Sequence, residues 1–86
     1  MHEMSVALEV CRMAEERLGV DAPRLVALGV TVGEAAGVEP HNLAFCLEAL
    51  LSEPPFLGAE LRLRREPGDG LHLEYLEITD DGHPDD

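Results

Sequence analysis

An apolar stretch in the middle of the chain, residues 24–32, limits the fold more than any other feature. In an extended chain, alternate side chains point to opposite faces, and here both alternate sets are apolar or small. One set is Val26, Leu28, Val30 and Val32, and the other is Leu25, Ala27, Gly29 and Thr31. A strand of this composition needs cover on both faces. We therefore predict that residues 24–32 form the central strand of a sheet.

Two amphipathic helices flank this stretch. Apolar residues at three- and four-residue steps predict a first helix over residues 5–18, with Ser5 as N-cap and Gly19 just beyond its end. We expect residues 1–4 to be an extended lead and residues 21–23 to be a turn. A similar stripe predicts a second helix that begins at about Glu39 and ends near Leu51. Pro40 suits its first turn, where a missing N–H costs little.

Two further strands follow, at about residues 59–64 and 71–78. The first alternates leucines with charged residues, a pattern with one buried and one exposed face. The second starts with Leu71 and Leu73 and then changes phase, which predicts a β-bulge near Glu74-Tyr75. The segment between the strands, residues 67–70, has the composition of a tight turn, so we predict a β-hairpin.

The elements occur in the order helix, strand, helix, strand, strand. Two helices with one apolar stripe each can cover one face of a three-stranded sheet, which gives a two-layer α+β sandwich. A length of 86 residues with 45% hydrophobic content is consistent with one small ordered domain. We place this domain at residues 1–79 and expect the acidic residues 80–86 to form a flexible tail.

The charge balance limits the possible partners. The chain has 6 basic and 18 acidic residues and a net charge of −12 at pH 7. Nucleic acids and anionic membranes both require basic surfaces, so we expect neither as a partner, whereas cations or a basic protein are favoured. No apolar run is as long as a membrane span, and no signal peptide is recognisable. We therefore expect a cytoplasmic protein.

The first three residues, Met1-His2-Glu3, form a candidate metal site. We expect the large side chain of His2 to block removal of Met1, which leaves a free α-amine one peptide unit from an imidazole. The pKa values of these groups lie near about 8 and about 6.5, so both lose a proton easily near neutral pH. With the backbone nitrogen between them they can form two fused chelate rings. Nitrogen-rich tetragonal sites of this kind suit Ni(II) or Cu(II).

Other reactive side chains favour structural roles. Cys11 and Cys46 form no CxxC motif and lie on apolar helix stripes, so we interpret both as small core residues. His72 is expected to face solvent. Arg62, together with Arg64 and Arg65, is expected to form cross-strand pairs with Glu74 or Glu77. No Ser-His-Asp arrangement and no phosphate-binding loop is recognisable, so we do not expect an enzyme.

Several segments, in this order and spacing, resemble one family. The chain begins Met1-His2-Glu3-Met4-Ser5, and Gly33-Glu34-Ala35-Ala36-Gly37-Val38-Glu39-Pro40 leads into the second predicted helix. Residues 58–61 and 73–78 match the flanks of the last two strands of that family. The chain thereby resembles the HypA/HybF family, nickel-insertion accessory proteins for maturation of nickel–iron hydrogenase and, in some bacteria, of urease. The resemblance extends to about Thr79.

One departure from the family pattern is large. Family members carry an inserted zinc module with two CxxC pairs between the last two strands. In this chain residues 64–70 occupy that place and include no cysteine. The resemblance therefore implies the nickel-binding domain of the family without its zinc module, and we expect no structural zinc.

The resemblance also implies which residues bind metal. It places the Ni(II) site on the amine and backbone of Met1, His2 and Glu3, with the His2 imidazole as the key side chain. The Glu3 carboxylate is then left to tune or orient the site. Glu39 occupies the position of an acidic side chain associated with that site. A carboxylate there also suits the positive end of a helix dipole, so both a ligand role and a capping role stay open. His41, two residues on, could orient Glu39.

Three functions follow from these observations. The first is a nickel metallochaperone that works with hydrogenase or urease maturation proteins. The second is a metal-independent protein-interaction domain that keeps the fold of the family. The third is an unspecific metal buffer built on His83 and the acidic tail. An exposed edge strand also leaves room for a homodimer formed by strand addition.

Overall fold

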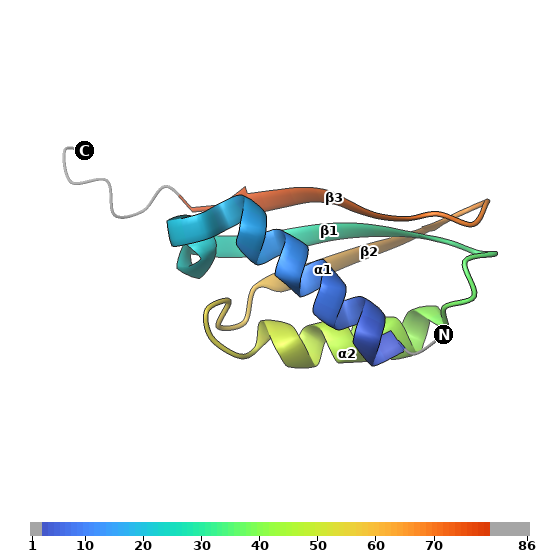
Figure 1. Cartoon of the computed structure of the whole chain (residues 1–86), viewed down its shortest axis with the longest axis horizontal. Helices are drawn as coiled ribbons and strands as arrows, with labels where there is room; N and C mark the ends of the chain where they lie inside the picture. Colours follow the sequence, from blue (N-terminus) through green and yellow to red (C-terminus); the bar gives the residue numbers. More distant parts are fainter. Residues whose placement is uncertain (1–2, 80–86) are drawn as a thin grey trace.

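The computed structural model describes residues 3–79 of the chain. Its elements are α1 (Glu3–Leu18), the 3₁₀ helix η1 (Gly19–Arg24), β1 (Leu25–Gly33), α2 (Pro40–Leu51), β2 (Glu60–Glu66) and β3 (Leu71–Ile78). Both helices pack on one face of a three-stranded sheet, which confirms the predicted α+β class (Figure 1). Met1, His2 and the predicted tail at residues 80–86 lie outside the described residues. No helix within residues 3–79 is long and apolar enough to cross a bilayer.

The apolar middle stretch is the central strand, as predicted. The strand order is β2-β1-β3, and β1 runs parallel to β2 and antiparallel to β3. Leu28, Val30 and Val32 of β1 pack in the core beneath the helices. Ala27 and Thr31 belong to the other alternate set and are also buried. The position of β1 therefore follows from its composition, because apolar residues on both faces are covered only in the middle of a sheet.

The predicted β-hairpin is wrong, because β2 and β3 lie on opposite sides of β1. The turn between them instead crosses the end of β1. The backbone N–H groups of Gly33 and Ala35 donate to the carbonyl oxygens of Gly70 and Gly68, at 2.7 and 2.8 Å, and the N–H of Glu34 donates to Glu66 at 2.8 Å. A buried strand must have its backbone groups paired on both edges. This requirement separates β2 from β3.

The strand register confirms the predicted β-bulge and adds a second irregularity. Gly29 lies opposite Tyr75 and Val30 lies opposite Leu73, so Glu74 is the extra residue on β3. The second shift falls on β1, between Leu25 and Ala27. Its extra residue, Val26, is 45% exposed. The prediction that Val26 lies on a covered face of the strand is therefore wrong.

Two boundaries near the N-terminus differ from prediction. α1 begins at Glu3 and has no N-cap at Ser5, so the expected extended lead is wrong for Glu3 and Met4. A carboxylate in the first turn stabilises this earlier start, because it faces the positive end of the helix dipole. The expected turn at residues 21–23 is part of η1, and Gly19 ends α1 with a φ of +55°, as a C′ glycine does.

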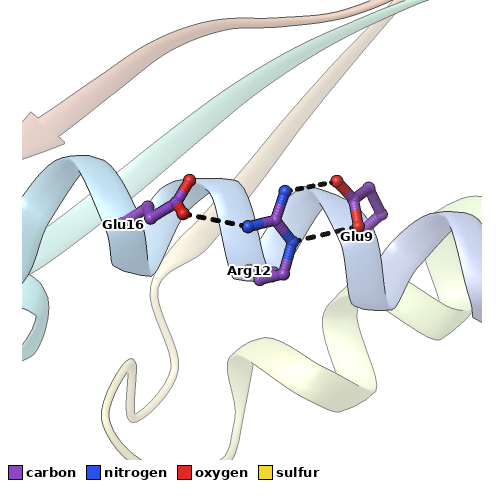
Figure 2. A network of polar contacts seen from close by, with 3 residues as sticks. All are labelled: Glu9, Arg12 and Glu16. Carbon is purple, nitrogen blue, oxygen red and sulfur yellow. Dashed lines mark hydrogen bonds and ion pairs between the residues drawn. The ribbon is translucent and has the colours of Figure 1, made fainter.

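The outer face of α1 is polar, as its sequence pattern predicts. The guanidinium of Arg12 contacts the carboxylates of Glu9 at 2.6 Å and Glu16 at 3.1 Å (Figure 2). All three side chains are more than half exposed. Such surface pairs contribute little to stability because water and salt screen them.

Side chains of the outer strands cover the far face of the sheet. Arg62 of β2 reaches across β1 to Glu77 of β3 at 3.0 Å, which confirms the expected cross-strand pair, and also contacts Glu60 at 3.3 Å. The ring of Tyr75 lies over Gly29, where an added Cβ would come within 2.3 Å of a ring atom. The small residues of β1 thus leave room for large side chains from both neighbours.

Replacing Gly33 by alanine should destabilise the protein, because the turn between β2 and β3 crosses directly over Gly33. A Cβ there would lie 2.4 Å from the carbonyl oxygen of Gly68 and 2.9 Å from the nitrogen of Gly70, so the turn backbone must move. We expect the free energy of unfolding, measured by urea denaturation, to fall by about 1–3 kcal/mol.

Gly29→Ala is the matched control for this substitution. The three atoms nearest to its Cβ all belong to the ring of Tyr75, an exposed side chain that can rotate away. We expect a smaller loss of stability than for Gly33→Ala. Equal losses in the two variants would contradict the structural role assigned to the crossing turn.

Candidate metal centre

Two segments meet at the place where the sequence predicts metal ligands. Glu3 lies in the first turn of α1, and Glu39 directly precedes α2. The carboxylate oxygen Oε2 of Glu3 accepts a hydrogen bond from the backbone N–H of Glu39 at 2.9 Å. This contact joins residues 36 positions apart, and it sets the beginnings of the two helices side by side (Figure 1).

Glu39 caps the second helix. Its backbone is extended, with φ −82° and ψ 117°, and its Oε1 accepts a hydrogen bond from the backbone N–H of Asn42 at 2.7 Å. Pro40 occupies the first helical turn, as predicted. The capping role considered for Glu39 is therefore observed. A carboxylate has about four lone-pair sites, so the cap leaves acceptor capacity for a metal ion.

Both carboxylates are ionised at neutral pH. The N–H of Glu39 is the main cause of a lowered pKa at Glu3, and the N–H of Asn42 is the main cause of a lowered pKa at Glu39. His41 Nδ1, 3.4 Å from Glu39 Oε2, adds to the second effect. A carboxyl group with a lowered pKa stabilises the fold above the ordinary value of 4.5 and loses that contribution as the pH falls further. At physiological pH the site therefore holds two negative charges.

The structure brings together only part of the predicted site. Glu3, Glu39 and His41 are neighbours, and His41 is 88% exposed. Met1 and His2 lie outside the described residues, so the chelate itself stays a prediction. Within residues 3–79 no group of three or more His, Cys, Asp and Glu side chains is arranged to hold a metal ion. The described residues alone therefore do not form a metal centre.

The two cysteines belong to the hydrophobic core, as predicted. Cys11 is buried, and burial raises the pKa of its thiol to about 11, which keeps it protonated at neutral pH. Cys46 packs against the same core from α2. Residues 67–70 link β2 to β3 and contain no cysteine. With only two cysteines in its sequence, the chain cannot by itself supply a four-cysteine zinc site.

A groove that the sequence did not predict lies beside this site. It has a volume of about 510 Å³ and lies between α1 and β3. Its lining includes Ser5, in the first turn of α1, and Val38, which directly precedes Glu39. The groove walls come from three separate segments of the chain, residues 5–13, 36–38 and 69–73. No local sequence pattern could have indicated them.

Comparisons with known proteins identify the family. A family model described as "Hydrogenase/urease nickel incorporation, metallochaperone, hypA" matches residues 1–71. Relatives include the hydrogenase maturation factors HypA of Geobacter metallireducens, 36% identical over 70 residues, and of Streptomyces avermitilis, 39% identical over 70 residues. The alignments cover 81% and 79% of this chain but 62% and 53% of the relatives. The chain thus spans less than two thirds of their length.

A solved structure has the same fold. The solution structure of the Ni metallochaperone HypA from Helicobacter pylori superposes with a TM-score of 0.65 at 16% sequence identity, and covers 93% of this chain and 88% of that chain. At this identity the likeness concerns the fold alone. The sequence matches, with relatives above 30% identity and a family model that spans most of the chain, establish the relationship. The chain belongs to the HypA family of hydrogenase and urease nickel-incorporation proteins.

Proposed function

We propose that this chain is a nickel-binding, metallochaperone-like accessory protein. It holds one Ni(II) at its N-terminus for maturation of a nickel–iron hydrogenase or of urease, and it catalyses no reaction itself. The observation that carries the proposal is the hydrogen bond from the N–H of Glu39 to the carboxylate of Glu3. This bond brings the ionised carboxylate of Glu3, the residue that follows Met1-His2 in the sequence, to the residue that carries the second ionised carboxylate, Glu39.

The Met1 amine, the His2 imidazole and the backbone nitrogens of His2 and Glu3 are the proposed ligands. Glu3 is the first residue of α1, and the first four N–H groups of a helix have no partner within the helix. The nitrogen of Glu3 can therefore bind metal without breaking a helical hydrogen bond. The negative charges of Glu3 and Glu39 stabilise a cation at this point, which the two positive helix ends would otherwise disfavour.

The exposure of the site suits a carrier of metal. The contacts of Glu3 with Glu39 and of Glu39 with Asn42 are both at the surface. Structural metal sites are closed by protein ligands on all sides, whereas an exposed site leaves the ion open to attack by ligands of a recipient. Nickel is thus proposed as cargo that is passed on.

A metal-independent interaction domain is the alternative function. The observation that favours it is the direct turn from β2 to β3. This alternative predicts that the chain keeps its fold and its partners but has no tight nickel site. The two functions therefore differ in a simple binding measurement.

His2→Ala should abolish the tight nickel site, because it removes the imidazole from the chelate. Calorimetric titration of the unmodified N-terminus should give about one Ni(II) per chain, and the variant should bind more than about 100-fold more weakly, a loss beyond that expected for an outer partner of a ligand. His72→Ala, at an exposed position of β3, is the control and should bind as the parent does. Equal affinity of the His2 variant and the parent would exclude this chelate.

Deletion of residues 80–86 distinguishes a nickel site at the N-terminus from a metal buffer built on the acidic tail. The proposed site lies at the opposite end of the chain, so the shortened protein should retain its single nickel equivalent. Loss of binding on deletion would instead support the acidic metal buffer.

Glu39→Ser should separate the ligand role of Glu39 from its capping role. Serine is a good N-cap, so the variant keeps a capping oxygen while it removes the carboxylate. We expect the thermal midpoint to stay close to that of the parent and nickel affinity to fall by about 10–100-fold. Glu16→Ser, which removes an exposed acid from the outer face of α1, controls for net charge. If Glu39→Ser leaves nickel affinity unchanged, Glu39 is a cap only.

A further inference from the structure

We propose that the groove between α1 and β3 is a docking site for a protein segment that carries apolar side chains flanked by basic residues. The binding of this segment needs no nickel. Its suggested purpose, to hold a partner against the metal site, rests on the proposed function.

The groove has the size and walls of a site for apolar side chains. Val6, Val10 and Met13 of α1 form one wall, and Leu71 and Leu73 of β3 form the opposite wall. Its volume of about 510 Å³ lies within the range of about 300–1,000 Å³ typical of binding pockets. Val6 and Met13 remain partly exposed, and the flexible thioether of Met13 can adapt to the shape of an occupant.

The charges at the groove favour a partner of positive charge. Among residues 3–79, Glu9 and Asp69 are the only charged residues that line the groove, and none of the arginines does. Glu9 forms an ion pair with Arg12 (Figure 2), whereas Asp69 has no ion-pair partner within the described part of the chain. The whole chain has a net charge of −12. Lysine or arginine beside the apolar anchors of a partner would therefore be attracted to this surface.

The same charge argues against a second copy of the chain as the occupant. Two copies would bring net charges of −12 together, and like charges across an interface cost free energy. The tail at residues 80–86 is also acidic and lacks basic residues. A separate basic partner is the occupant that the charges favour.

The position of the groove connects docking with metal transfer. The groove lining includes Val38, which directly precedes Glu39, and Ser5, which lies in the same helical turn as Glu3. A segment bound along the groove would therefore lie close to the contact between Glu3 and Glu39. Holding two reacting groups together in this way raises their effective concentration.

A synthetic peptide can test the docking site in the absence of nickel. The probe is a short acetylated peptide with leucines at helical spacing on one face and lysines on the other. We expect saturable binding to the full chain, with the amide NMR shift changes centred on Val6, Met13 and Leu71. Binding should weaken as salt is raised, because the charges are exposed. A peptide with glutamates in place of the lysines should not bind.

Two substitutions on α1 make the test specific. Met13→Glu puts a charge into the groove and should weaken peptide binding by at least about tenfold. Leu8→Glu makes the same change at a 52% exposed position outside the groove and should leave the affinity unchanged. Asp69→Arg, on the exposed turn, should also weaken peptide binding. This variant replaces Met13→Glu in the test if Met13→Glu fails to fold.

Three results would overturn the docking proposal. They are equal weakening by the Leu8 and Met13 variants, equal binding of the glutamate peptide, and a concentration-dependent dimer in sedimentation that Met13→Glu abolishes. The last result would assign the groove to a second copy. Nickel titration of Met13→Glu keeps the two proposals separate, because a loss of docking should leave the nickel site intact.

Discussion

The hydrogen bond from the backbone N–H of Glu39 to the carboxylate of Glu3 connects the fold to the proposed metal site. It ties the first turn of α1 to the start of α2 and explains why α1 begins before the expected N-cap. It also lowers the pKa of Glu3, and because it uses the backbone N–H of Glu39, the Glu39 carboxylate remains able to cap α2. One contact thus orders the residues directly behind Met1-His2 and supplies negative charge there.

A second constraint shapes the turn between β2 and β3, which lies at the same end of the molecule as the start of α2 (Figure 1). β1 is buried on both faces and paired on both edges, so the turn that joins β2 to β3 must cross its end above Gly33. Asp69 of the same turn and Leu71 just beyond it also line the groove. The short connection therefore helps to form the surface on which we propose that a partner docks.

Patterns of local composition predicted most of the fold. The two apolar sets of β1 indicated a central strand, and the change of phase near Glu74 indicated the bulge. The false hairpin has a physical reason, since the alternation of a strand shows which face is buried but not which strand lies beside it. The contact of Glu3 with the backbone of Glu39 spans 36 positions and leaves no local signal. Family resemblance placed both residues at the site, but not the bond between them.

The central claim is that the α-amine of Met1 is a nickel ligand, and acetylation of that amine tests it most directly. Acetylation removes the amine charge and its lone pair while it leaves His2, Glu3 and Glu39 in place. A one-residue extension is less suitable, because it offers a new amine and a third-position histidine for a different chelate. Calorimetric titration of the acetylated and free proteins should show the single tight Ni(II) site only in the free protein. Equally tight binding by the acetylated protein would contradict the account.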